Sequence, residues 1–228
     1  ELCQKVMELF DFNFSKGRFD TSAHPFCGGV PDDVRITTRF NEKEFLQSLF
    51  GIIHETGHAR YEQNLPKKFQ GQLIGKARSM SIHESQSLFF EMQIGSHPKF
   101  IEQLVPIIIE KFGKQKSFTS ENLYKLITKV NPGFIRVDAD EVTYPAHIIV
   151  RYEIEKKLIN NQIKVDEVPE LWDEKMKNLL GVDTKGNFKN GVMQDIHWPE
   201  GLFGYFPCYT LGAIYAAQWF HIMSKEIN

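Results

Sequence analysis

The chain has 228 residues, of which 42% are hydrophobic, so it is long enough to bury a sizeable core. Its formal net charge of −2 at pH 7 gives no sign of the basic surface that binds nucleic acid, so no nucleic-acid partner is expected. The longest apolar runs, residues 104–109 and 211–220, are too short to span a bilayer, so no membrane partner is expected either.

The three cysteines are scattered and odd in number, which argues against a disulfide framework and favours a reducing, cytoplasmic location. The chain begins at Glu1 without an initiator methionine and ends on Asn228 directly after an apolar helical run. We therefore expect a piece of a longer protein, truncated at both ends. At this length one large domain or two small ones can form, and we expect one domain over residues 1–228.

The N-terminal part is expected to contain one helix and one strand. Residues 1–14 have the pattern of the last turns of a helix that ends near Gly17. The stretch 19–31 is rich in glycine and proline and is expected to be irregular. Val34–Phe40 is rich in β-branched residues and is the best strand candidate.

A helix is predicted over Glu42–Gln63. Asn41 suits the N-cap and Glu44 falls at the N3 position, as in a capping box. The first half of this helix carries apolar residues at helical spacing, namely Phe45, Leu46, Leu49, Phe50, Ile52 and Ile53. Gly57 lowers helix propensity by about 1 kcal/mol, which suggests that another backbone approaches closely there.

The same helix carries the pattern His54-Glu55-Thr56-Gly57-His58. Positions i and i+4 lie on one face of an α-helix, so the two imidazoles can point at one metal ion. Glu55 lies beside that point without having to be a ligand, as the general base of a zinc hydrolase does. The alternative is a buried helix with two hydrogen-bonded histidines and no metal.

A third ligand is predicted at Glu84, on a mostly apolar helix from about Arg78 to Ile94. An unpaired buried carboxylate is very costly, and a metal ion would satisfy it. His54, His58 and Glu84 then form a set of N and O ligands with one open position, which is typical of catalytic zinc sites. The alternative is a half-exposed Glu84 that pairs with a nearby lysine or arginine.

The rest of the chain is predicted to be mainly helical. Helices are expected over about Pro98–Phe112, from Thr119 or Ser120 to Val130, over Asp140–Asn160 and Pro169–Leu180, and from Pro207 onward. The long irregular stretch Gly181–Gly204 carries Gln194-Asp195-Ile196-His197-Trp198 and is a candidate site loop. The predicted fold class is therefore mainly α, with one small β element.

Six short motifs in this order resemble the carboxypeptidase Taq family of HExxH zinc metallocarboxypeptidases. They are His24-Pro25-Phe26, Asp33-Val34-Arg35-Ile36-Thr37-Thr38-Arg39, the His54–His58 pattern, His83-Glu84-Ser85-Gln86, Ile135-Arg136-Val137-Asp138-Ala139-Asp140 and Gly191-Val192-Met193-Gln194-Asp195-Ile196-His197-Trp198. Family members are considerably longer, and this chain resembles their catalytic, C-terminal part. The resemblance implies a helical, zincin-like metallopeptidase domain with a deep groove, in a protein that forms a homodimer.

The resemblance also implies roles for single residues. The His-His-Glu set would bind a divalent metal, zinc or alternatively cobalt, and Glu55 would be the general base. Arg136 would hold the terminal carboxylate of the substrate. Tyr209 would donate to the oxyanion, with Tyr205 as the competing candidate. The other candidates for the substrate site are His24, Arg35, Gln194 and His197.

These observations predict a metal-dependent carboxypeptidase that removes single residues from peptides with a free C-terminus. Such an enzyme needs a fixed cation for the free carboxylate, and a bidentate arginine has the best shape for it. One alternative is an endo-acting or dipeptide-releasing zinc oligopeptidase with the same metal set. Another is an inactive helical fragment that lacks its N-terminal half.

Overall fold

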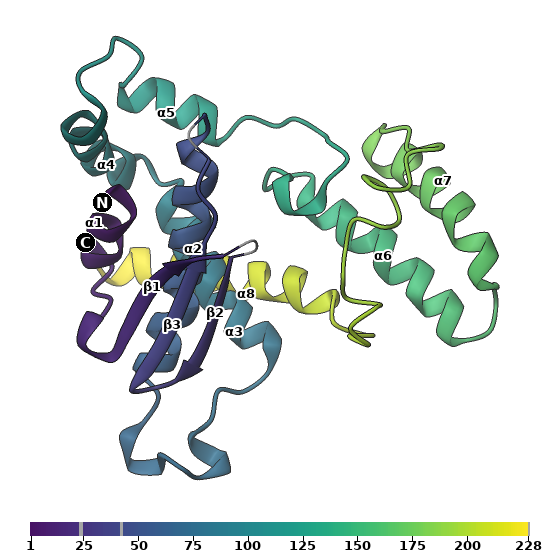
Figure 1. Ribbon diagram of the computed structural model, residues 1–228, viewed down its shortest axis with the longest axis horizontal. Coiled ribbons are helices and arrows are strands. Elements are labelled where there is room, and N and C mark those ends of the chain that lie inside the picture. The colour runs from purple at the N-terminus through teal and green to yellow at the C-terminus, as the bar shows by residue number, and fades with distance from the viewer. Residues whose placement is uncertain (23–24, 42, 228) are drawn as a thin grey trace. The chain divides into compact units, whose positions relative to one another are not determined.

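The computed structural model describes all residues except 23, 24, 42 and 228, and it contains two compact units (Figure 1). Unit 1 comprises Glu1–Ile127 and Leu211–Asn228, and unit 2 comprises Thr128–Thr210. Helices dominate both units and the described strands form one small sheet, so the predicted fold class is confirmed. The expectation that the whole chain acts as one domain stays a prediction, and each unit is described by itself below.

The sheet lies in unit 1 and has the strand order β1-β3-β2. Strand β3 (Asp33–Thr38) confirms the predicted strand and pairs in parallel with β1 (Gly17–Thr21) and antiparallel with β2 (Phe26–Val30). The prediction that residues 19–31 are irregular was wrong for residues 19–21 and 26–30, which belong to β1 and β2. Their composition is poor in strand formers, and it is pairing with the backbone of β3 that makes them strands.

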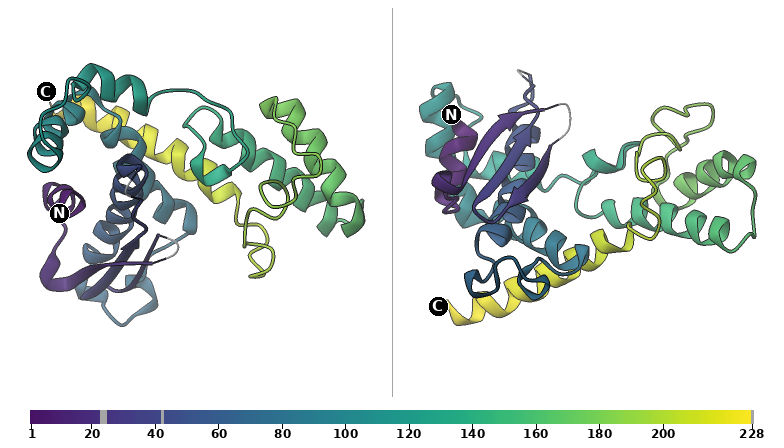
Figure 2. Two further views of the ribbon diagram at one scale, coloured as in Figure 1. Left: turned by 45° about the horizontal axis from the view of Figure 1, so that its top comes forward. Right: turned by 60° about the horizontal axis from the view of Figure 1, so that its bottom comes forward.

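Unit 1 also contains a set of helices. They are α1 (Leu2–Leu9), α2 (Phe45–Gln63), α3 (Met80–Leu88), α4 (Pro98–Phe112), α5 (Ser120–Ile127) and, from Leu211 onward, α8 (Pro207–Glu226). Shorter elements are the 3-10 turns η1 (Phe14–Lys16), η2 (Lys67–Phe69) and η3 (Leu73–Gly75) and the π-helix η4 (Phe89–Gly95). Helix α2 packs on the sheet at β3 and contacts α1, α3 and η4, and Figure 2 shows it along one face of the sheet.

Several helix ends differ from the predictions. Helix α1 ends at Leu9 rather than near Gly17, because Asp11 takes a positive φ of 57° that stops the helix. Helix α2 begins at Phe45, and the expected capping box is absent. The side-chain oxygen of Asn41 instead accepts a hydrogen bond from the backbone N–H of Lys43, within the turn that precedes the helix.

Two further elements depart from the expected continuous helices. The helix expected over 78–94 starts at Met80 and changes from α to π at Phe89. The helix expected from Asp140 starts only at Tyr144, because the Asp140 carboxylate accepts backbone N–H groups in the turn before it. By contrast, α4, the proline start of α8 and the irregular stretch 181–204 are confirmed.

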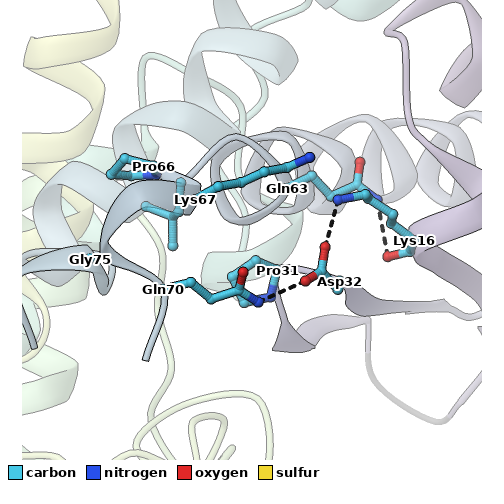
Figure 3. Close-up of a pocket in the computed structure, with 9 residues that line it drawn as sticks. Lys16, Pro31, Asp32, Gln63, Pro66, Lys67, Gln70 and Gly75 are labelled. Atoms are coloured by element: carbon cyan, nitrogen blue, oxygen red, sulfur yellow. Dashed lines mark hydrogen bonds and ion pairs between the residues drawn. The ribbon is translucent and has the colours of Figure 1, made fainter. Parts of the chain in front are cut away.

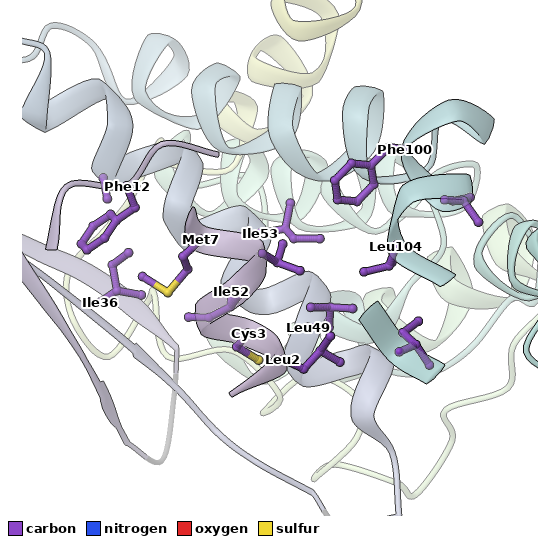
Figure 4. Packing of buried hydrophobic residues seen from close by; sticks show 14 of the residues in the cluster. Leu2, Cys3, Met7, Phe12, Ile36, Leu49, Ile52, Ile53, Phe100 and Leu104 are labelled. Atoms are coloured by element: carbon purple, nitrogen blue, oxygen red, sulfur yellow. The ribbon is translucent and has the colours of Figure 1, made fainter. Parts of the chain in front are cut away.

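The core of unit 1 fixes the first half of α2. Figure 4 shows side chains from α1, α2, β3 and α4 pointing toward one another, among them Leu2, Met7, Ile36, Leu49, Ile52, Ile53, Phe100 and Leu104. All of these are buried. Burying one such aliphatic side chain contributes roughly 1.5–3 kcal/mol. The apolar half of α2 therefore anchors the helix, and the half with the two histidines follows rigidly from it.

Unit 2 is built on a pair of helices, α6 (Tyr144–Ile159) and α7 (Val168–Leu180), preceded by the 3-10 turns η5 (Arg136–Asp138) and η6 (Val165–Glu167). The two helices share a buried cluster of Val150, Ile154, Val168, Trp172, Met176 and Leu180. The irregular stretch after α7 packs Val182, Val192 and Trp198 against this cluster. Among the described residues of both units, no helix is long and apolar enough to cross a membrane.

The close approach predicted at Gly57 is confirmed. A Cβ atom at this position would lie 2.6 Å from both the carbonyl oxygen of Gln86 and the Cα of Ser87, so α2 and α3 cross there in backbone contact. We expect Gly57→Ala to force the helices apart and to lower the free energy of unfolding by about 1–3 kcal/mol in urea denaturation. Gly51→Ala on the same helix is the matched control. Its Cβ would meet none of the described atoms closer than 3.7 Å, so no loss is expected, and equal losses in both variants would contradict the prediction.

Candidate active site

Three side chains of unit 1 can hold a metal ion, His54 and His58 from α2 and Glu84 from α3. One ligand atom from each lies within 4.8 Å of the other two. The Nε2 atoms of His54 and His58 are 3.6 Å and 3.5 Å from the Glu84 carboxylate oxygens. These distances exceed the about 2.9 Å of a typical N–H···O hydrogen bond. They are close to the about 3.4 Å between two ligands of a tetrahedral zinc ion. The donor set and its spacing therefore fit a divalent metal.

The crossing of α2 and α3 at Gly57 brings Glu84 to the two histidines. The i, i+4 spacing on α2 places both imidazoles on one face, as predicted. Glu84 is buried, and a Cβ on Gly212 of α8 would lie 3.0 Å from the Glu84 Cβ. Helix α8 thus closes over Glu84 and holds its carboxylate toward α2.

The second ring nitrogens of both histidines also have partners. His54 Nδ1 lies 2.6 Å from a carboxylate oxygen of Glu91, in the π-helix η4. His58 Nδ1 lies 2.7 Å from Nδ1 of His83, whose Nε2 lies 2.8 Å from a carboxylate oxygen of Glu62. His83 was named from the sequence only as part of a motif, without a role, and Glu62 and Glu91 were not named. Glu62 follows His58 by four residues, and this spacing was the signal available for it.

Several carboxylates lie around His54, His58 and Glu84, the three residues called the metal group below. Burial lowers the pKa of His54, but the carboxylates of Glu84 and Glu91 outweigh it and raise the pKa to about 10. Burial also raises the pKa of Glu55, which His54 partly offsets and Glu84 and Glu91 reinforce, to about 7. A cluster in which several buried carboxylates face two imidazoles favours a bound cation.

A second group of predicted residues meets in unit 2, around the buried Arg136. Its Nη2 is 2.9 Å and its Nε 3.2 Å from one oxygen of Asp195, and its Nη1 donates to the hydroxyl of Tyr144 at 2.7 Å. The guanidinium carbon lies 4.8 Å from the ring centre of Tyr209. Among the described residues, these hydrogen bonds use three of the five guanidinium N–H groups. Arg136 is therefore rigidly held.

The predicted site loop joins this group. The side-chain oxygen of Gln194 accepts the backbone N–H of Arg136 at 2.7 Å, and its amide nitrogen donates to three backbone carbonyls. His197 Nε2 lies 3.0 Å from the Tyr209 hydroxyl. The ring of Tyr205 lies 5.3 Å from that of Tyr209 and 5.4 Å from that of His197. The loop is thus tied to the arginine by both backbone and side-chain contacts.

A further arginine in unit 2, Arg151, was not distinguished by the sequence from the other arginines of the chain. It is fully buried, and its guanidinium carbon lies 3.5 Å from the ring centre of Trp198. Its Nη1 is 3.9 Å from Asp195, and Trp198 donates to Glu155 at 2.7 Å. Among the described residues its three guanidinium nitrogens have no hydrogen-bond partner, so stacking on Trp198 and the charge of Asp195 are what hold Arg151 against the loop.

One predicted substrate-site residue with a described position, Arg35, is not part of either group. Arg35 lies exposed on β3 and forms an ion pair with Asp33 at 2.8 Å. His24 lies outside the described residues.

A small pocket in unit 1 is lined by Lys16, Asp32, Gln70 and neighbouring residues (Figure 3). Both oxygens of Asp32 are engaged there, by Lys16 at 2.5 Å and by Gln70 at 2.7 Å. The pocket has a volume of about 20 Å³, which suits a single water molecule rather than a peptide. We therefore assign it no role in the site.

His147, on α6 of unit 2, predicts a pH dependence of stability. Burial, together with the charge of Arg136, lowers its pKa to about 4, whereas an unfolded histidine has a pKa of about 6.5. Between these values the unfolded chain binds more protons, so the free energy of unfolding falls as the pH drops. The expected loss is at most about 3 kcal/mol and is complete near the folded pKa.

Urea unfolding at neutral pH and at about pH 4 measures this loss. The variant His147→Gln should lose less stability than the unsubstituted protein, because its side chain does not titrate. Acid release of a metal would affect both proteins equally and cancels in the comparison. The same loss in both would contradict the prediction.

Comparison with known proteins agrees with this geometry. The family described as "Carboxypeptidase Taq (M32) metallopeptidase" matches residues 1–228. The chain is 44% identical to Carboxypeptidase 1 of Bacillus subtilis (strain 168), over 100% of the chain and 46% of that protein. It is 46% identical to Thermostable carboxypeptidase 1 of Thermus thermophilus, over 98% of the chain and 44% of that protein.

The similar solved structures are carboxypeptidases as well. Trypanosoma Cruzi Metallocarboxypeptidase 1 is 53% identical with a TM-score of 0.97, covering 100% of this chain and 47% of that one. The Pyrococcus furiosus carboxypeptidase structure titled "Apo-Mg" is 37% identical with a TM-score of 0.94, covering 99% of this chain and 46% of that one. The chain spans about half the length of the relatives it matches. The chain belongs to the carboxypeptidase Taq (M32) family of metallopeptidases.

Proposed function

We propose that the protein is a metal-dependent carboxypeptidase that hydrolyses the C-terminal peptide bond of peptides. The observation that carries the proposal is the convergence of His54, His58 and Glu84 within 4.8 Å, with the buried Glu55 on the same helix. Curated relatives that match nearly the whole chain are named carboxypeptidases, which supports peptide substrates with a free C-terminus.

In this proposal His54, His58 and Glu84 bind Zn²⁺, with Co²⁺ as the alternative. A bound divalent metal supplies Lewis-acid activation of a water molecule and of the scissile carbonyl. Glu55 takes the proton that the attacking water loses and delivers it to the leaving amine. Burial raises the pKa of the Glu55 carboxyl, which favours its uptake of a proton.

We assign the terminal carboxylate of the substrate to Arg136. Among the described residues, Asp195 and Tyr144 use three of its five N–H groups, so two remain for a second carboxylate. The bidentate contact with Asp195 also pre-orients the guanidinium, which lowers the entropy lost when a substrate binds. His24, Arg35, Gln194 and His197 are proposed to line the substrate site.

Tyr209 is proposed as the donor to the oxyanion, with Tyr205 as the alternative. The Tyr209 hydroxyl and Nε2 of His197 share one hydrogen bond of 3.0 Å. A tyrosine hydroxyl is a hydrogen-bond donor of the kind that an oxyanion needs.

The proposal extends to a cytoplasmic protein that forms a homodimer. The scattered cysteines support the cytoplasmic location, and the family resemblance supports the dimer.

The proposed function is tested by metal analysis and by paired peptide substrates that end in a free carboxylate or in an amide. We expect stoichiometric metal in the purified protein and release of single C-terminal residues from the free peptides only. Equal cleavage of both peptides would favour an endo-acting or dipeptide-releasing oligopeptidase. Absence of stoichiometric metal would favour the inactive fragment.

A further inference from the structure

The ring nitrogens of His54 and His58 that face away from the metal group contact Glu91 and His83, and His83 in turn contacts Glu62. None of these three side chains is a proposed metal ligand. We propose that Glu91, and His83 together with Glu62, are positioning residues that fix the tautomers of the two ligand histidines. This inference rests on the proposed metal-binding function. It concerns residues of unit 1 alone.

The first arm of the arrangement is direct. His54 turns Nε2 toward Glu84, at 3.6 Å, and Nδ1 toward Glu91, at 2.6 Å. An ionised carboxylate only accepts hydrogen bonds, so when His54 binds the metal as a neutral imidazole, its one proton lies on Nδ1. Nε2 then presents its lone pair to the metal group, as a ligand must.

The position of Glu91 follows from the helix that carries Glu84. The two residues are seven positions apart, about two turns, and so lie on one side of the α3–η4 segment. The imidazole of His54 contacts both carboxylates, one with each nitrogen. The π-helix that contains Glu91 is a rare element that is frequent at functional sites.

The second arm passes through another imidazole. His58 turns Nε2 toward Glu84, at 3.5 Å, and its Nδ1 lies 2.7 Å from Nδ1 of His83. Two nitrogens at this distance share one proton. If His58 is a ligand through Nε2, that proton sits on its own Nδ1, and His83 Nδ1 accepts it.

The tautomer of His83 is then determined as well. Because its Nδ1 accepts, its own proton must lie on Nε2, which is 2.8 Å from the acceptor Glu62. The relay therefore runs from His58 through His83 to Glu62, and each link has one donor and one acceptor. His54 is thus hydrogen-bonded to a carboxylate directly, and His58 is linked to one through His83. Such outer partners raise the basicity of the ligands and hold their rings in place.

The tautomer of His83 can be measured without any substitution. Long-range ¹H–¹⁵N correlation NMR of the zinc-loaded protein distinguishes a protonated ring nitrogen from a bare one. We expect the Nε2–H form for His83 and the Nδ1–H form for His54 and His58. An Nδ1–H form of His83 in the zinc-loaded protein would overturn the relay.

Zinc affinity, measured by competition with a chromophoric chelator, tests the energetic role. We expect His83→Phe, Glu62→Leu and Glu91→Leu each to weaken zinc binding, by about 10–100-fold for the residues in direct contact with a ligand. The matched control is His221→Phe, which replaces an exposed histidine of α8 and should leave the affinity unchanged. Circular dichroism checks that each variant is folded.

Double variants separate a relay from independent structural effects. Glu62 acts through His83, so Glu62→Leu should add nothing in the His83→Phe background, whereas Glu91→Leu should multiply the loss. Full multiplication of the Glu62 and His83 effects would overturn the relay, as would unchanged affinity of His83→Phe. If the unsubstituted protein binds no stoichiometric zinc, the proposed function itself fails. Zinc binding that His58→Ala abolishes and His83→Phe leaves intact would overturn the relay alone.

Discussion

Replacing Glu55 with glutamine is expected to leave metal binding unchanged and to lower kcat by a factor of about 10²–10⁴. Glutamine has nearly the same shape as glutamate but accepts no proton from water at neutral pH. The proposed ligands His54, His58 and Glu84 remain in place, since Glu55 is adjacent to the metal group without belonging to it. The measurement is kcat on a peptide with a free C-terminus, with metal content determined on the same sample.

The control for this prediction is Glu110→Gln on α4. Glu110 is exposed and pairs with Lys5 at 2.6 Å, and surface pairs of this kind contribute little to stability or function. The Glu110→Gln variant should therefore retain the kcat of the unsubstituted protein. If Glu55→Gln also turned over at nearly that rate, Glu55 would have no place in the mechanism. If it lost the metal, Glu55 would support the ligands instead.

Replacing Arg136 with alanine is expected to abolish most of the preference for a free C-terminal carboxylate. The loss of a charge-assisted, bidentate contact amounts to about 2–5 kcal/mol, which corresponds to about 30-fold or more in kcat/KM. The measured quantity is the ratio of kcat/KM for a peptide with a free carboxylate to that for its amide. We expect this ratio to fall toward one.

The ratio is chosen because Arg136 also stabilises unit 2. Its removal leaves Asp195 buried without its main partner, a change that costs roughly 3–5 kcal/mol. Loss of folded protein lowers the rate for both substrates equally and cancels in the ratio. Arg18→Ala is the matched control, because Arg18 is exposed and forms a surface ion pair with Asp20 at 2.6 Å. An altered ratio in Arg35→Ala and an unchanged one in Arg136→Ala would move the anchor to Arg35.

Helix geometry made part of the site predictable. Residues four apart lie on one face of any α-helix, so the juxtaposition of His54 and His58 followed from their spacing once a helix was expected there. The apolar half of α2 indicated which end of the helix the core would hold, and Leu49, Ile52 and Ile53 are indeed fully buried. Spacing alone did not reveal β1 and β2, because these strands owe their existence to pairing with β3.

Residue spacing did not predict the contacts that His54 and His58 make with residues far away in the sequence. Glu91 and His83 reach the ligand histidines from 37 and 25 positions away, and no periodicity within α2 points to them. The same holds for the surroundings of Arg136. Residue spacing does not distinguish it from the other six arginines, and its contacts with Asp195 and Tyr144 appear only in the structure.

The sequence by itself determined the mainly helical fold class, the helical face shared by His54 and His58, and the need for a close backbone at Gly57. These depend on local chemistry, since spacing, capping and propensity act within a few residues. Only the tertiary structure decided that α3 crosses at Gly57, that Glu91 and His83 contact the rings of His54 and His58, and that Asp195 pairs with Arg136. Such contacts depend on how distant helices pack, and packing is set by the shapes of all the buried side chains together.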